Sequence, residues 1–302
     1  MLGCAEDELS QDWQLDRTRI LAVRPIVQGE PDLVLGTRAE GRPGETLSFD
    51  SLTYSPASDP IGGLLWIACL DEENPNDGCS LDDSEKSEPD GSDLGAESGF
   101  IGFEPFFSPV LPIPEGVLDS LPEADREEGV SALVNVIAVP DGELDKFEDE
   151  SEDEKDLDVD NYEIAFKRVP VSTSSTPNHN PDIVDFVVAG EQLGGAAGFT
   201  ARTQKTYVIE PLLAEGHIET YAYTSSAGER EYRTEEPYFN WYSELGAAEA
   251  KDGASFDQPF SLHPYTSVEW TAPTEPGLIT IHVVVRDRRG GMGWRSLTVN
   301  VL

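Results

Sequence analysis

The feature that most constrains the fold is a strict two-residue alternation near the C-terminal end. In residues 278–285, Ile279, Ile281, Val283 and Val285 share one side, and the positions between them share the other. Successive side chains of a β-strand point to opposite faces, so this period predicts a strand with one face in a core. Residues 296–301 alternate in the same way. A glycine-rich stretch between the two segments predicts a hairpin turn in which the glycines supply positive φ.

Further strands are predicted wherever a short apolar or alternating run lies between turn-forming residues. In the first half of the chain they are 19–23, 46–50, 64–70, 130–139 and 162–166. In the second half they are 183–188, 206–210, 217–224, 238–242 and 267–271. The run 64–70 is continuously apolar and fits a central sandwich strand with Trp66 as its core anchor. One short helix is predicted over 121–128, with Ser120 as its N-cap.

These patterns predict an all-β protein with two immunoglobulin-like β-sandwich domains, as does the length of 302 residues at roughly 100–200 residues per domain. Residues 17–171 are expected to form the first domain, with long acidic loop insertions and at most a short helix. Residues 182–302 are expected to form the second. Between them, 172–181 (STSSTPNHNP) has the composition of a linker. Residues 1–16 are polar and predict a flexible tether.

The charge is unusually negative, at −39, which disfavours nucleic acid as a partner because the surface repels phosphates. Residues 141–160 hold twelve acids in twenty positions and predict a solvated loop. Within it, Asp156, Asp158 and Asp160 have the D-x-D-x-D spacing that gathers carboxylates around calcium. An EF-hand loop needs Gly and Glu where Asn161 and Lys167 stand, so only a looser calcium site is a candidate, against a charge run that binds cations diffusely.

The three cysteines have different contexts. Cys69 and Cys79 are close enough in sequence to close a short loop, and Cys4 is left over beside the N-terminus. In an exported protein this pattern favours a disulfide between Cys69 and Cys79, whereas in a cytosolic protein they would be unrelated thiols.

The start of the chain, Leu2-Gly3-Cys4 followed by acidic residues, resembles the lipobox of bacterial lipoproteins. The resemblance implies that Cys4 is acylated after removal of a signal peptide and becomes the first mature residue. The charged and apolar regions of a signal peptide do not precede it here, which indicates that Met1 is not the natural start. Acyl chains anchor stably because each buried CH₂ contributes about 0.8 kcal/mol. The alternative is an ordinary cysteine in a terminal tail.

Residues 238–302 resemble the bacterial Ig-like and PKD-type modules of exported proteins. The resemblance rests on Trp241 in YFNWY, the W-T-A-P element at 270–273, and Val285-Arg286-Asp287 leading to two glycines. Ile279 and Ile281 stand where an antibody-type domain has its corner tyrosine and second cysteine, so the sandwich lacks an inter-sheet disulfide.

The whole chain resembles a group of uncharacterised myxobacterial-type lipoproteins. The features that carry this resemblance are Cys4, the DWQLDR and TPNHNP segments, the strand from Trp66 to Cys69 followed by Cys79, and the block from Thr234 to Trp294. The resemblance implies an envelope location and says nothing about chemistry.

Catalytic patterns are missing from the sequence: it has four histidines, no HExxH and no G-x-S-x-G. His282 alternates onto the outward face of its strand and is expected at the surface. The basic cluster 286–289 is expected to flank a hairpin, with an anion cradle as the alternative. The expected function is therefore non-catalytic and needs no cofactor: a lipid-anchored envelope protein, at the outer membrane, that binds the membrane through Cys4 and an unknown protein or polysaccharide through its domains. A calcium- or polysaccharide-binding module is the alternative, and a secreted hydrolase is the third choice.

Overall fold

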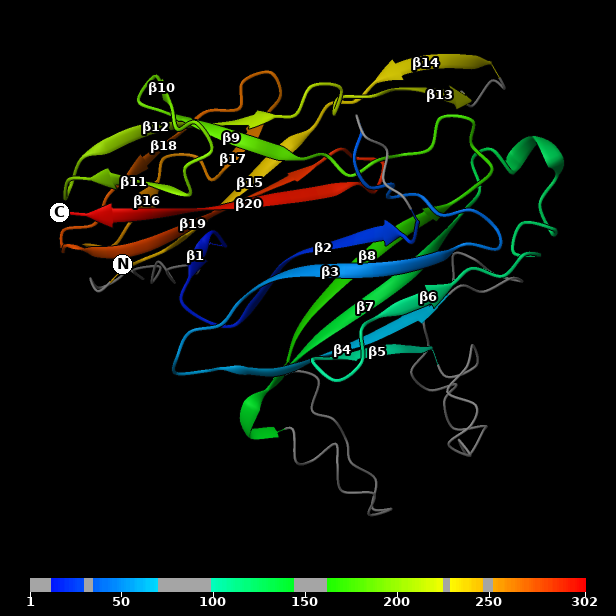
Figure 1. The fold of residues 1–302 in the computed structure, drawn as a ribbon, viewed down its shortest axis with the longest axis horizontal. Helices are drawn as coiled ribbons and strands as arrows, with labels where there is room; N and C mark the ends of the chain where they lie inside the picture. Colours follow the sequence, from blue (N-terminus) through cyan, green and yellow to red (C-terminus); the bar gives the residue numbers. More distant parts are fainter. Residues whose placement is uncertain (1–11, 30–34, 70–98, 144–161, 225–228, 247–251) are drawn as a thin grey trace, which may run out of the picture.

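The computed structural model describes residues 12–29, 35–69, 99–143, 162–224, 229–246 and 252–302 (Figure 1). The protein is all-β, and the described residues contain no α-helix. The helix expected over 121–128 is a single 3₁₀ turn, η2 (Glu123–Asp125), which follows Pro122 rather than a Ser120 cap. A second 3₁₀ turn, η3 (Asp141–Glu143), follows the longest strand of the first domain.

The first domain is a sandwich of a three-stranded and a four-stranded antiparallel sheet. The smaller sheet has the order β2 (Arg19–Val27), β3 (Thr46–Tyr54), β6 (Val110–Pro112). The larger has the order β5 (Phe100–Glu104), β4 (Ile61–Cys69), β7 (Val130–Pro140), β8 (Glu163–Val171). Trp66 lies fully buried between the sheets and packs on Phe49, with ring centroids 5.7 Å apart. Its burial confirms Trp66 as a core anchor.

The second domain is also a sandwich of two sheets. One has the order β10 (Glu191–Gln192), β9 (Ile183–Val188), β12 (Thr206–Leu213), β18 (Val268–Thr271), β16 (Ser255–Phe256). The other has the order β1 (Gln14–Leu15), β15 (Tyr238–Glu244), β19 (Gly277–Arg286), β20 (Met292–Val301), β11 (Gly198–Ala201), with β17 (Phe260–Leu262) also on β15. A separate hairpin, β13 (Thr220–Thr224) and β14 (Arg230–Thr234), completes the domain.

The strand order makes both domains immunoglobulin-like. In the second domain β9, β12 and β18 take the places of strands A, B and E, and β15, β19 and β20 those of C, F and G. In the first domain β2, β3 and β6 correspond to A, B and E, and β4, β7 and β8 to C, F and G. Each domain carries a fully buried tryptophan on its C strand, Trp66 and Trp241. This is the position at which immunoglobulin domains anchor their core.

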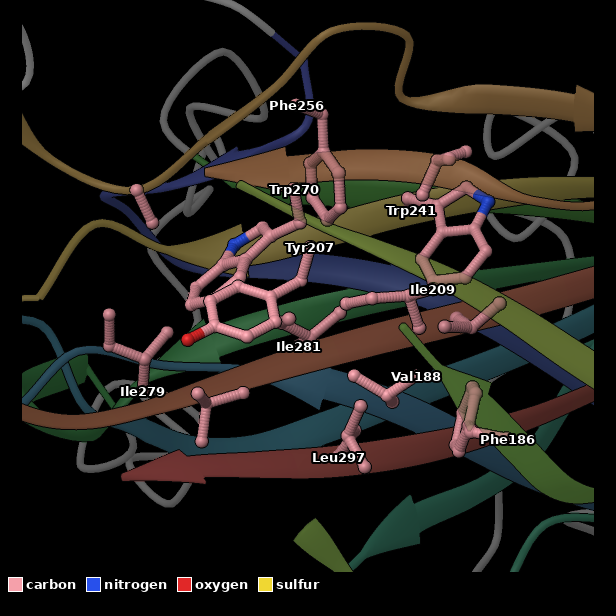
Figure 2. Packing of buried hydrophobic residues seen from close by; sticks show 14 of the residues in the cluster. Phe186, Val188, Tyr207, Ile209, Trp241, Phe256, Trp270, Ile279, Ile281 and Leu297 are labelled. Atoms are coloured by element: carbon pink, nitrogen blue, oxygen red, sulfur yellow. The ribbon is translucent and has the colours of Figure 1, made fainter. Parts of the chain in front are cut away.

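The core of the second domain is aromatic in its centre and aliphatic along β19 and β20 (Figure 2). Trp241 packs on Phe256, with ring centroids 5.9 Å apart, and donates from Nε1 to Ser261. Ile279 and Ile281 are buried in the same cluster, as their alternation predicts. A buried aliphatic side chain contributes about 1.5–3 kcal/mol, so this one face of β19 accounts for a large part of the domain's stability.

The turn between β19 and β20 uses its glycines differently from the expectation. Gly290 has a positive φ of 110°, but Arg288, with φ of 70°, shares that role. Gly291 and Gly293 are required for close approach instead: a Cβ on Gly293 would lie 1.8 Å from the carbonyl oxygen of Pro181. The glycines therefore let the segment between the domains pack against this hairpin.

The end of the presumed tether is not free. Trp13 and Leu15 are buried, and β1 pairs in parallel with β15 of the second domain. Trp13 meets Phe256 edge-on at 5.5 Å. Trp13 completes the second domain's core, and Leu15 belongs to the apolar contact between the domains, so the expectation of a flexible tether is wrong for residues 12–16. Residues 1–11 lie outside the described part of the chain.

The two domains touch through an apolar contact between β2 and the outward face of β19 and β20 (Figure 1). Its buried members are Leu15, Leu21, Ala22, Val284 and Met292. His282 was expected at the surface but is only 9% exposed. Its side chain does point outward from the second sandwich, and the first domain lies over that face.

Candidate functional site: a polar junction between the domains

The segment 172–181 is buried at several of its polar residues, although Thr173 and Ser175 are exposed. Ser172, Asn178 and Asn180 are 1%, 0% and 3% exposed. Polar side chains are buried at little cost only when they are hydrogen-bonded, and this segment finds partners in both domains. The surrounding group, called the polar junction below, consists of Glu40, Lys167, Ser172, Asn178, His179, Asn180, Glu219, Glu235, Asp287 and Arg289.

Asn180 joins the two domains directly. Its Nδ2 donates to the carbonyl oxygen of Pro25 in β2 at 2.7 Å, and its Oδ1 accepts from the N–H of Met292 in β20 at 3.0 Å. An amide has both donors and an acceptor, so one side chain satisfies backbone groups from two sheets that otherwise would be unpaired. The asparagine thereby fixes the spacing between β2 and β20.

Asp287 organises the turn that faces the segment. Its Oδ1 accepts from the backbone N–H groups of Arg289 at 2.7 Å and Gly291 at 2.9 Å, and its Oδ2 accepts from Asn178 Nδ2 at 2.9 Å. The side chain is 1% exposed. Burial raises its pKa, and these hydrogen bonds oppose the rise.

Arg289 is the central cation of the polar junction. Its Nη1 lies 3.0 Å from Glu235 and 3.4 Å from Glu219, and its Nη2 lies 3.8 Å from Glu40 of the first domain. Its Nη2 also donates to the carbonyl oxygen of Thr176 at 2.9 Å. Arginine suits this position because its planar fork donates in several directions at once. The guanidinium is fully engaged by the protein's own carboxylates, which argues against the anion cradle considered for 286–289.

The carboxylates of the polar junction also accept hydrogen bonds from the segment between the domains and from one another's backbone. Glu219 accepts from the backbone N–H of His179 at 3.0 Å and contacts His179 Nδ1 at 2.8 Å. Glu235 accepts from the N–H of Glu219 at 3.0 Å, and Glu40 accepts from Asn178 N–H at 2.9 Å and from the Ser172 hydroxyl. Every described carboxylate of the junction is therefore bound on at least two sides.

The pKa values of two side chains in the polar junction are shifted from their ordinary values. Burial raises the pKa of Glu235 to about 7, because the desolvation outweighs its bonds to Glu219 and Arg289. Burial lowers the pKa of Lys167 to about 8, although Asp287 opposes the change. Lys167 is 7% exposed and donates from Nζ to the carbonyl oxygen of Gly290, so it ties β8 of the first domain to the turn of the second. Perturbed pKa values often mark active sites, but structural ion networks produce them too.

The chemistry of this arrangement is positioning. Apart from the Oδ1 of Asn178, which is buried without a hydrogen-bond partner, the donors and acceptors described above are directed at one another. Neither of the two described pockets is lined by junction residues. One described pocket, of about 360 Å³, lies in the second domain and is lined by Pro211, Leu213, Ile218, Pro264 and their neighbours, with Glu210, Glu215 and His263 among them. Tyr265, which lies in sequence between the lining residues Pro264 and Thr266, is 85% exposed.

The residues expected to carry chemistry lie elsewhere. Cys4, Cys79 and the triplet Asp156, Asp158 and Asp160 fall outside the described residues. Cys69 is the last residue of β4. Because Cys79 is not among the described residues, the pairing of the two cysteines stays a prediction. Across the described ranges no cluster of three or more His, Cys, Asp or Glu is placed to hold a metal ion.

Comparisons with known proteins leave the chain without a family. No family model matches it, and no curated protein matches it. Among solved structures, fibronectin(III)-like modules of Clostridium thermocellum CbhA are 8% identical over 92% of this chain and 93% of that one, with a TM-score of 0.27. The Ig1-2 module of Drosophila receptor protein tyrosine phosphatase DLAR is 11% identical over 92% and 99%, with a TM-score of 0.26.

A nucleoside hydrolase-related hypothetical protein from Saccharophagus degradans is 20% identical, with a TM-score of 0.28. That match covers 43% of this chain and 28% of the other. At such TM-scores none of these likenesses carries an argument about activity, and the immunoglobulin-like assignment rests on the strand order above. In the part of the chain that the structure describes, no helix has the length and apolarity needed to span a membrane.

Proposed function

We propose that the protein is a non-catalytic, lipid-anchored component of the cell envelope, at the outer membrane, in which two β-sandwich domains serve a structural or binding role. The observation that carries the proposal is the polar junction. Ten buried or half-buried polar residues from both domains and the segment between them hold the sandwiches in one arrangement. A protein that presents a surface at a fixed distance and angle from an anchor needs such a joint.

The anchor itself is proposed from the sequence. The Leu2-Gly3-Cys4 segment resembles a lipobox, and acylation of Cys4 would attach the chain to a membrane with the two domains projecting into the periplasm or from the cell surface. The resemblance to myxobacterial-type lipoproteins supports the same location. The partner would be another protein or a polysaccharide, because the charge of −39 disfavours nucleic acid.

The test is expression from the native upstream region in the natural host, followed by intact-mass analysis and membrane fractionation. The proposal predicts a mature chain that begins at acylated Cys4 and sediments with membranes. The matched variant Cys4→Ser should be unmodified and recovered in the soluble fraction. A wild-type chain that is unmodified and soluble would overturn the anchor. Reproducible turnover of ester, glycoside or peptide substrates that co-purifies with the chain would overturn the non-catalytic role.

One observation favours polysaccharide binding as the second candidate. The pocket at Glu210 and His263 is lined by both apolar and acidic residues, and the exposed Tyr265 lies in sequence between its lining residues Pro264 and Thr266. Flat aromatic faces and hydroxyl-binding carboxylates are the groups that recognise neutral sugars. Affinity electrophoresis in gels that contain a neutral glucan should show retardation that Tyr265→Ala abolishes. A parallel calcium titration that leaves the melting temperature unchanged would remove the calcium alternative at Asp156, Asp158 and Asp160.

A further inference from the structure

The β13–β14 hairpin forms the connection between the B and C strands of the second domain and lies apart from the sheets of both sandwiches (Figure 1). At the start of β14, Arg230 lies 3.6 Å from Glu127 of the first domain. Its two strands pair only with each other among the described strands. An isolated two-stranded hairpin is marginally stable in water, so a hairpin kept in this form needs support at its base or a further partner.

The base of the hairpin is held in place by the polar junction. The guanidinium of Arg289 lies over the ring of Tyr221, 4.3 Å from its centroid. Glu235 N–H donates to the carbonyl oxygen of Glu219 at 2.9 Å where the two strands begin and end. Ala222 N–H donates to Thr176 Oγ1 at 3.4 Å, so β13 lies against the segment between the domains. β14 is consequently the outer strand.

The outer edge of β14 is available for another strand. Residue pairs along an antiparallel ladder alternate between those that exchange backbone bonds and those that do not. The N–H of Ala222 donates away from β14, toward Thr176, so Ala222 and Tyr232 form a pair that does not exchange backbone hydrogen bonds. The N–H and C=O of Tyr232 therefore point to the outer edge. All five residues of β14 are exposed, and Tyr232 is 71% exposed.

The charges along β14 are complementary to those of a second, antiparallel copy of the same strand. If a second copy pairs antiparallel with Tyr232 opposite Tyr232, then Glu231 of each copy stands opposite Arg233 of the other. Opposite charges placed directly across two strands stabilise the pairing, and like charges oppose it. The two side chains lie 3.3 Å apart within one strand, and each is 47% exposed, so both are accessible to a second copy.

From this edge and this charge pattern we propose that β14 pairs with β14 of a second copy of the chain about a two-fold axis. The two hairpins become one four-stranded antiparallel sheet, with an isologous interface of the kind that closes a dimer. The long-range charge of each copy opposes association, so the dimer is expected to form at physiological salt, where charges beyond about 8 Å are screened, and to weaken as salt is removed.

Charge reversal provides the test, by sedimentation velocity of the full chain over a range of concentrations at about 0.15 M salt. The wild type should show a concentration-dependent dimer. Glu231→Arg and Arg233→Glu should each raise the dissociation constant about tenfold or more, because each places like charges opposite one another twice. An equimolar mixture of the two variants should form a heterodimer. The double variant, in which both charges are exchanged, should form a homodimer.

A backbone variant separates strand pairing from charge alone. Tyr232→Pro removes an N–H from the outer edge without removing a β13–β14 bond, so it should abolish the dimer. Tyr232→Thr keeps that N–H and should retain it, and the melting temperature of each variant reports whether the fold persists. A wild type that stays monomeric at every concentration overturns the proposal. So does a dimer that survives both single charge reversals, or a mixture of the two that gains nothing over either alone.

Discussion

Replacing Arg289 with methionine should destabilise the protein by about 3–5 kcal/mol at pH 7, the cost expected when one partner of a buried ion cluster is removed. The guanidinium lies within 3.0–3.8 Å of Glu235, Glu219 and Glu40, and its side chain is 13% exposed. Methionine keeps much of the volume and leaves three carboxylates without a cation. Equilibrium unfolding in urea, followed by tryptophan fluorescence, measures the loss.

The loss should depend on pH in a defined direction. The pKa of Glu235 is raised to about 7, above its ordinary value of 4.5. A carboxyl with a raised folded pKa contributes most stability below its unfolded pKa, and this contribution disappears as the pH rises through the folded pKa. At pH 5 Glu235 is already protonated in the folded wild type, so removal of Arg289 leaves fewer buried charges. The cost of Arg289→Met should therefore be lower at pH 5 than at pH 8 by roughly 1–1.5 kcal/mol.

The neighbouring residue supplies a matched control. Arg288 belongs to the same turn and lies 3.7 Å from Glu236, but the two side chains are 52% and 77% exposed. Exposed pairs contribute about 0–1 kcal/mol, so Arg288→Met should change stability by no more than that. Arg289→Lys should be intermediate, because an ammonium is a point charge that cannot reach three carboxylates. Equal losses for Arg288→Met and Arg289→Met, or a loss for the latter that ignores pH, would refute the assignment of Arg289 as the central cation.

Three further predictions address the interface, the N-terminal segment and the cysteines. Burial lowers the pKa of His282 to about 4, so stability should be lost as pH falls from 6.5 to 4, by about 3 kcal/mol, and His282→Gln should flatten that part of a melting-temperature profile. Trp13→Ala should cost about 3–5 kcal/mol in urea unfolding, whereas a free tether would show no change. In folded, oxidised protein a thiol assay should find neither Cys69 nor Cys79 reactive, and reduction should cost about 2–3 kcal/mol; two reactive thiols would disprove the bridge.

The fold was largely accessible from the sequence because its principal strands carry their own period. The expected strand 183–188 coincides with β9, and the alternating segment 278–285 falls within β19. β11 and β14 were not predicted, the first because its four residues are held by parallel pairing with β20 and show no alternation. Every residue of β14 is exposed, so no core period marks it.

The polar junction could not be predicted, and the reason is local. Glu40 and Glu235 lie in polar stretches of a chain with 59 acidic residues, and nothing near them in sequence distinguishes a buried acid from an exposed one. The burial of His282 was equally hard to predict. Two apolar residues share its outward face, and one of them, Val284, is fully buried whereas the other, Leu278, is 72% exposed.

The two kinds of contact between the domains serve different ends. The apolar cluster of Leu21, Val284 and Met292 contributes free energy but little direction, because the hydrophobic effect scales with area and not with angle. The bonds of Asn180 and Arg289 are directional, and breaking any of them by rotation would leave buried groups unpaired, at about 1–3 kcal/mol each. Apolar contact thus holds the domains together, and the polar junction selects the one angle at which they meet. That angle sets where the β13–β14 hairpin lies relative to both sandwiches.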